Sequence, residues 1–116
     1  MISARDYQSL MDIVDSAQIA ISYVDGLTED EFWNDMQCQD SVIRRIEIVG
    51  EAATRLSQDL RSELPHIPWR RIVGMRNVMI HQYDDVSLDI VWDTTQTFLP
   101  FLIQEIATFL KAQLEP

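Results

Sequence analysis

The sequence of 116 residues has few cysteines, glycines and prolines and no long apolar run. Cys38 is the only cysteine, so no disulfide can form within the chain, although a small secreted domain would usually need several. The longest apolar run, residues 98–103, includes a proline and is far shorter than the roughly 20 residues that cross a bilayer. Asp6, Asp12 and Asp15 interrupt the region where a signal peptide would be apolar. These absences predict a cytoplasmic protein that neither spans a membrane nor is secreted.

Basic residues are also scarce, since nine lysines and arginines stand against 19 acidic residues and the formal net charge is -10. Such a charge disfavours nonspecific binding of nucleic acid, which depends on neutralising phosphates. Seven arginines nevertheless lie between residues 44 and 76 with four acidic residues, whereas the rest of the chain holds two basic and fifteen acidic residues. A positive middle with acidic ends can direct one phosphate into a cleft. These arginines can equally pair with neighbouring acids, and the sequence leaves both interpretations open.

Histidine occurs only twice, at positions 66 and 81, and no pair of His or Cys residues has the spacing of metal ligands. The sequence therefore predicts neither a metal site nor a bound cofactor.

The apolar residues recur at helical spacing along most of the chain. The pattern predicts a first helix over about 4–25 and a short helical turn after the capping pair Thr28 and Glu31. A second long helix should begin near Asp40 or slightly earlier and carry Leu56 on its buried side. No segment alternates with the period of two residues that marks a strand, so no sheet is expected.

Prolines divide the second half of the chain. Pro68 is suited to the first position of a third helix, which should run from about Trp69 to His81 or Gln82. Ser87 can cap a last long helix, and Pro100 inside it should cause a kink near residues 96–100. The predicted fold class is all-α, an antiparallel bundle of four main helices in one domain over residues 1–116.

The segment RNVMIHQY, residues 76–83, ends the third predicted helix and holds the residues best suited to chemistry. At about 100° per residue, Arg76 and His81 are ~140° apart and Asn77 is ~40° from His81. Their polar groups can therefore border one concavity, and Tyr83 can bend back over it from the following turn. A histidine at a helix end is also often a structural residue, because the helix dipole favours a cation there.

Glu51, which follows Gly50 on the second long helix, has two possible roles. It can approach the same concavity and tune His81, or it can form a surface ion pair with Arg55 four residues further on. The sequence does not decide between them.

The string GMRNVMIHQYDDVSLDIVW, preceded by IPWRRI and by IVGEAA on the previous helix, resembles the HepT-like branch of the HEPN superfamily over nearly the whole chain. The resemblance implies a homodimer or higher even oligomer in which two such motifs meet across a cleft and act as a metal-independent endoribonuclease toxin. It also implies a nucleotidyltransferase antitoxin as partner, which adenylylates the tyrosine that matches Tyr83.

The chemistry of the residues agrees with that implication. RNA is cut when its 2′-OH is deprotonated and attacks the adjacent phosphorus, so a catalyst needs a proton carrier and a cation. His81 can carry the proton and Arg76 can stabilise the negative charge of the transition state. Asn77 can orient His81 or a phosphate oxygen, and Tyr83 can donate to phosphate or stack on a base.

Two other interpretations remain open at this stage. The chain can be a non-catalytic helical module that binds a nucleotide or docks a nucleotidyltransferase through Arg76 and Tyr83, or a bundle that serves only to dimerise. RNA cleavage that depends on His81 separates the first prediction from both.

Overall fold

A computed structural model describes residues 2–81 and 87–114, with the backbone alone for residues 77–81. Its elements follow one another as α1 (Ala4–Val24), α2 (Glu29–Trp33), α3 (Met36–Thr54), α4 (Gln58–Glu63), α5 (Trp69–His81), α6 (Leu88–Asp93), the π-helix η2 (Thr94–Phe98) and α7 (Leu99–Leu114). The described residues contain no strand, as the sequence predicted.

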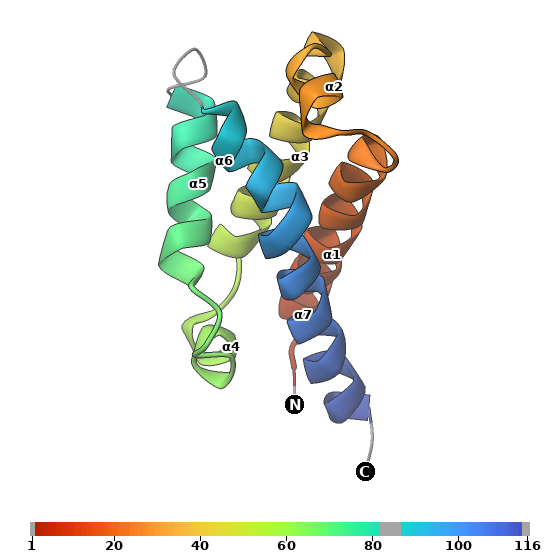
Figure 1. The fold of residues 1–116 in the computed structure, drawn as a ribbon. Helices are drawn as coiled ribbons and strands as arrows, with labels where there is room; N and C mark the ends of the chain where they lie inside the picture. Colours follow the sequence, from red (N-terminus) through yellow and green to blue (C-terminus); the bar gives the residue numbers. More distant parts are fainter. Residues whose placement is uncertain (1, 82–86, 115–116) are drawn as a thin grey trace.

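Four long rods run up and down in turn: α1, α3, α5, and the rod formed by α6, η2 and α7 (Figure 1). Helix α3 is central, because it packs against α1 on one side and against α5 on the other. The last rod crosses α3 near its α6 end and then packs along α1 through η2 and α7. The predicted antiparallel bundle of four main helices is confirmed. None of the described helices is long and apolar enough to cross a membrane.

Local capping explains the first two helices. The Ser3 hydroxyl accepts a hydrogen bond from the Asp6 amide at 3.0 Å, and Gly26 provides the positive φ of 80° that turns the chain after α1. Thr28 and Glu31 form the predicted capping box at the start of α2, with hydrogen bonds of 2.9 and 3.1 Å. The helix limits in this region agree with the prediction to within one residue.

The middle of the chain holds a helix that the sequence interpretation missed. Helix α3 begins at Met36, earlier than Asp40, because the Asp35 carboxylate caps it by accepting from the Cys38 amide. It ends at Thr54, so the buried Leu56 lies beyond it. Helix α4 follows before Pro65, and its cap is the Ser57 hydroxyl.

The core lies between α1, α3 and the neighbouring helices. Its fully buried large side chains include members of every long rod, and they are Leu10, Ile13, Phe32, Val42, Ile46, Val49, Ile67, Ile72, Leu99, Leu102 and Ile106. One polar contact connects the buried Asp6 of α1 to the exposed Ser57 that precedes α4: the Ser57 hydroxyl donates to the Asp6 carboxylate at 2.6 Å and the Ser57 amide donates at 2.9 Å. Burial alone would raise the pKa of Asp6, but hydrogen bonds from Ser57 and Ser3 outweigh it and keep this pKa below its ordinary value.

The last rod differs in detail from the predicted kinked helix. Residues 94–98 form one turn of π-helix, in which the Leu99 amide donates to the Thr94 carbonyl. Pro100 explains it, because proline has no amide hydrogen to continue an α-helical ladder. The disruption therefore falls where predicted, as a change of hydrogen-bonding pattern. Ser87 occupies the position before α6, but its side chain makes no capping hydrogen bond, contrary to the prediction.

Candidate functional site

Helix α5 carries Arg76, Asn77 and His81, and its beginning is fixed by local contacts. The Trp69 indole donates to the Leu64 carbonyl at 3.1 Å, and the Ile72 amide donates to the Pro68 carbonyl at 3.1 Å. Trp69 and Ile72 are buried, so this end of α5 is anchored in the core. The predicted extent of the helix, to His81, is confirmed.

Arg76 lies directly against Gly50 of α3. A Cβ atom added to the buried Gly50 would overlap the Cβ of Arg76 and lie 3.0 Å from its Cγ and 3.1 Å from its Cα. Only a glycine permits the backbones of α3 and α5 to approach this closely. Gly50 therefore sets the position of the half-buried Arg76.

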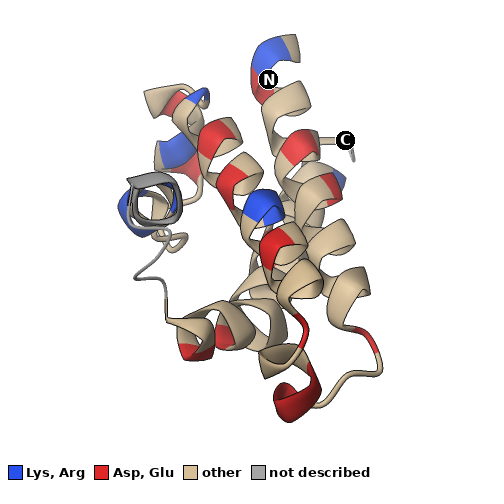
Figure 2. Ribbon diagram, turned by 90° about the horizontal axis from the view of Figure 1, so that it is seen from above, with Lys and Arg blue, Asp and Glu red and all other residues tan. Residues whose placement is uncertain are grey.

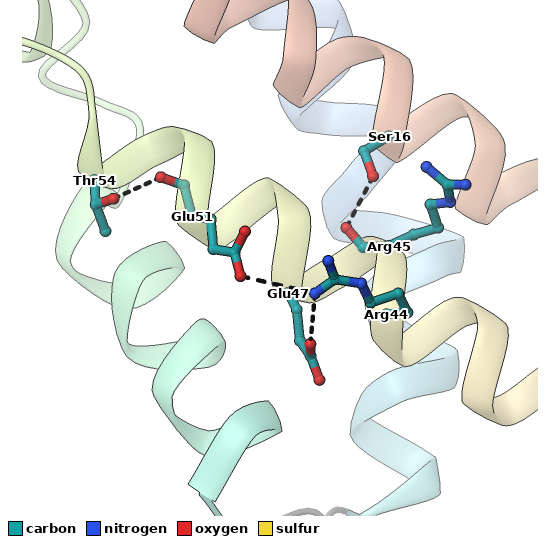
Figure 3. Close-up of polar contacts among 6 residues, drawn as sticks. All are labelled: Ser16, Arg44, Arg45, Glu47, Glu51 and Thr54. Carbon is teal, nitrogen blue, oxygen red and sulfur yellow. Dashed lines mark hydrogen bonds and ion pairs between the residues drawn. The ribbon is translucent and has the colours of Figure 1, made fainter.

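Beside Gly50, one face of α3 carries a charged cluster of Arg44, Glu47 and Glu51 (Figure 3). The Arg44 guanidinium lies 3.1 Å from the Glu47 carboxylate and 3.7 Å from that of Glu51. The Glu47 side chain is only 15% exposed, whereas that of Arg44 is 59% exposed. The carboxylates of Glu47 and Glu51 thus hold the solvent-accessible guanidinium of Arg44 on one face of α3. Glu51 on this face is the residue that follows Gly50.

The structure corrects the predicted ion pair between Glu51 and Arg55. Glu51 approaches Arg44, and Arg55 pairs with Asp12 of α1 at 3.2 Å. The reason is tertiary packing, since α1 brings an acid to Arg55 that the spacing within α3 cannot reveal. The role predicted for Glu51 in tuning His81 stays a prediction.

Several arginines of the predicted basic segment, residues 44–76, make contacts within the molecule. Arg55 pairs with Asp12, Arg44 is held by two acids, and the Arg71 guanidinium lies 5.1 Å from the centre of the Phe98 ring. Helices α2 and α6 contain only acidic charged residues (Figure 2). These contacts favour the interpretation of neighbouring ion pairs for Arg44 and Arg55, with Arg44 still accessible.

The remaining site predictions are only partly within the described structure. Arg76, Asn77 and His81 share α5, and the five residue steps from Arg76 to His81 correspond to about 7.5 Å along its axis. The side chains of Asn77 and His81, and Tyr83 entirely, lie outside what the structure describes. Their convergence with Arg76 stays a prediction.

Sequence reasoning missed Gly50, Arg44 and Glu47. The spacing of Arg44, Glu47 and Glu51 along one helical face was a signal for the charged cluster. No local signal marked Gly50, because its partner is 26 residues further along the chain.

An all-helical bundle with Arg76 and His81 five positions apart on α5 is consistent with the HEPN class of proteins that the sequence resembles. The family model described as Ribonuclease HepT-like matches residues 13–109, and the chain belongs to this family. "Putative RNase MJ1380" of Methanocaldococcus jannaschii is 33% identical over 106 residues, covering 90% of this chain and 97% of the relative. "Probable ribonuclease HepT" of Thermococcus cleftensis is 33% identical over 100 residues, covering 86% and 89%. No solved structure matches.

Proposed function

We propose that the protein is an endoribonuclease toxin that cuts RNA with Arg76 and His81 in a cleft shared by two copies of the chain. The observation that carries the proposal is the placement of Arg76 and His81 on one helix, α5, in a chain of the Ribonuclease HepT-like family. The names of the two relatives support the same reaction class.

The reaction is an attack of RNA on itself. The 2′-oxygen forms a bond to the adjacent phosphorus and the bond from phosphorus to the 5′-oxygen breaks, which leaves a 2′,3′-cyclic phosphate. His81 of one copy accepts the proton of the 2′-OH, and His81 of the other copy gives a proton to the leaving 5′-oxygen. Arg76 stabilises the negative charge that builds on the phosphate, and Asn77 orients His81 or a phosphate oxygen.

The position of Arg76 against Gly50 supports its role. Helix packing fixes the main chain and the Cβ of Arg76 against Gly50. The Arg76 side chain therefore loses less freedom when its guanidinium binds a phosphate. Arg44 provides a second accessible cation, on the face of α3 that also carries Glu51 beside Gly50.

Neutralisation by a nucleotidyltransferase antitoxin completes the proposal. In that step the Tyr83 oxygen attacks the α-phosphorus of ATP, pyrophosphate leaves, and the phenolic proton passes to solvent. The attached AMP places a phosphate and a base at the end of α5, where RNA would bind. The exposed Tyr7 and Tyr23 are the internal comparison, because a modification specific to Tyr83 leaves them unchanged in peptide mass spectrometry.

The decisive experiment measures RNA cleavage in EDTA by the wild type and by His81→Ala, Arg76→Ala and Arg55→Ala. The proposal expects cyclic phosphate ends and a loss of at least 100-fold in the first two variants. Arg55→Ala is the matched control, because its guanidinium serves an ion pair with α1. Cleavage that survives in His81→Ala contradicts the proposal. Intact RNA together with measurable binding of ATP identifies a non-catalytic nucleotide-binding module.

A further inference from the structure

A groove lies between α5 and the last rod of the bundle (Figure 1). Its volume is about 780 Å³, within the range of roughly 300–1,000 Å³ that small-ligand sites occupy. Residues of both sides form its walls, and they include His66 and Arg71 on the α5 side and Ile90, Asp93, Phe98 and Phe101 on the last rod. The groove is therefore large enough for a ligand that contacts both rods.

The last rod presents hydrocarbon to this groove. Ile90 is 56% exposed and Phe101 is 38% exposed, and the rings of Phe98 and Phe101 are 6.1 Å apart. The eleven residue steps from Ile90 to Phe101 correspond to about 16 Å along the rod. Exposed aromatic rings beside a cation are the surfaces on which bases of single-stranded RNA stack. The groove is long enough for more than one base.

Arg71 and Asp93 give the groove one cation and one anion. The Arg71 guanidinium lies 5.1 Å from the centre of the Phe98 ring. Within the part of the chain that the structure describes, neither Arg71 nor Asp93 forms an ion pair. His66 is already engaged by Glu105 of α7 at 2.6 Å. A matching ligand thus carries an anion for Arg71 and hydrogen-bond donors for the Asp93 carboxylate.

A guanine nucleotide has this combination of groups. A carboxylate only accepts hydrogen bonds, and guanine alone among the four RNA bases presents two adjacent donors, its N1–H and its N2 amino group. Adenine and cytosine place an acceptor nitrogen beside their amino group, and uracil places a carbonyl on each side of its one N–H, so these acceptors repel the second carboxylate oxygen. The phosphate supplies the anion. Asp93 and Phe98 are five residue steps apart, about 7.5 Å, a span comparable to that from a base edge to its own phosphate.

We propose that the groove binds a guanosine of single-stranded RNA, with the base edge at Asp93, the phosphate at Arg71 and the neighbouring base on the Phe101 ring. The inference deepens the proposed function, on which its link to cleavage rests, because it names a base preference for the substrate. Helix α5 has three arginines and no acidic residue, so it does not repel a phosphate backbone. Arg71 precedes His81 by ten residue steps, about 15 Å along α5 and about 80° around it. A strand held at Arg71 can therefore reach the candidate site within a few nucleotides.

The test measures binding of short single-stranded RNAs by fluorescence anisotropy at one salt concentration. The His81→Ala variant is used so that RNA is not consumed, and the RNAs differ at a single position that carries guanine, adenine, cytosine, uracil or hypoxanthine. Guanine should bind about tenfold or more tightly than the other three standard bases. Hypoxanthine keeps the N1–H and lacks the N2 amino group, so it should fall between them. GMP alone should bind far more weakly than the guanine RNA, and equal affinity overturns the assignment to RNA.

Variants of the groove assign the contacts. In the same His81→Ala background, Asp93→Asn should abolish the preference for guanine, whereas Arg71→Ala should weaken all RNAs by about the same factor. Asp89→Asn is the matched control, because Asp89 is also exposed on α6 and does not line the groove. Circular dichroism checks that each variant is folded. Equal affinity for all bases, or a guanine preference that survives in Asp93→Asn, overturns the inference.

Two further outcomes separate this inference from the alternatives. Phe101→Ala should weaken RNA binding, and unchanged affinity, as expected if a protein covers this ring instead, overturns the inference. RNA cleavage is measured separately in chains that keep His81. Guanine-dependent binding by a chain that cuts no RNA supports the groove and contradicts the nuclease. Cleavage that requires His81 but is indifferent to guanine and to Asp93→Asn supports the nuclease and contradicts the groove.

Discussion

Replacing Gly50 by alanine tests the contact that positions Arg76. The added methyl group would overlap the Arg76 Cβ, so α5 must move from α3 by on the order of 1 Å to restore ordinary carbon contacts of about 3.5 Å. Overpacking of this kind costs about 1–3 kcal/mol, while the better helix propensity of alanine returns about 0.5–1 kcal/mol. We expect a net loss of about 1–2 kcal/mol and a fall in Tm of roughly 5–10 °C.

The assay combines thermal unfolding with RNA cleavage. A displacement of about 1 Å at a catalytic group can cost about 100-fold in rate, so cleavage should fall further than stability alone explains. Gly74→Ala is the matched control on α5, because no heavy atom lies within 4 Å of its added Cβ, and it should stabilise the protein by about 0.5–1 kcal/mol. Combining Arg76→Ala with Gly50→Ala should not relieve the overlap, because alanine keeps the Cβ atom at position 76. A Gly50→Ala variant as stable as Gly74→Ala refutes the reasoning.

Three further perturbations test the contact between Asp6 and Ser57 and the charged cluster on α3. Ser57→Ala removes the 2.6 Å hydrogen bond to Asp6 and the cap of α4, and should cost about 2–3 kcal/mol in urea denaturation, whereas Ser62→Ala should change little. Because the folded pKa of Asp6 is lowered, its contribution to stability is complete above the unfolded pKa of about 3.9 and is lost as pH falls through the folded value. Urea midpoints between pH 5 and pH 2 should therefore fall more steeply in the wild type than in Ser57→Ala. Arg44→Ala should weaken RNA binding and reduce the slope of log affinity against log salt by about one, while Arg45→Ala, on another side of α3, should not (Figure 3).

The sequence predicted well the features that depend on neighbouring residues. The first helix and the capping box of Thr28 and Glu31 depend on groups within a few positions of one another, and the structure has both as expected. The break near Pro100 was also predictable, because proline removes an amide hydrogen wherever it stands. The form of that break, a π-helix, was not.

Features that depend on distant residues were not accessible. Helix α4 is stabilised by the contact of Ser57 with Asp6, 51 positions away. Arg55 forms its ion pair with Asp12 of α1. Likewise, nothing around Gly50 in the sequence indicates that α5 will pass directly over it. The family resemblance indicated the helix that carries the site. The charged cluster on α3 was marked by its helical spacing, whereas the contact of Gly50 with Arg76 depends on how α5 packs against α3.

A cleft shared by two copies of the chain should make RNA cleavage depend on protein concentration. If the cleft needs two copies, the rate of RNA cleavage per chain should rise with protein concentration and reach half of its maximum near the dimer Kd. Cleavage per chain that is constant on dilution through the dissociation range would show that one copy suffices, whatever surface it uses to dimerise.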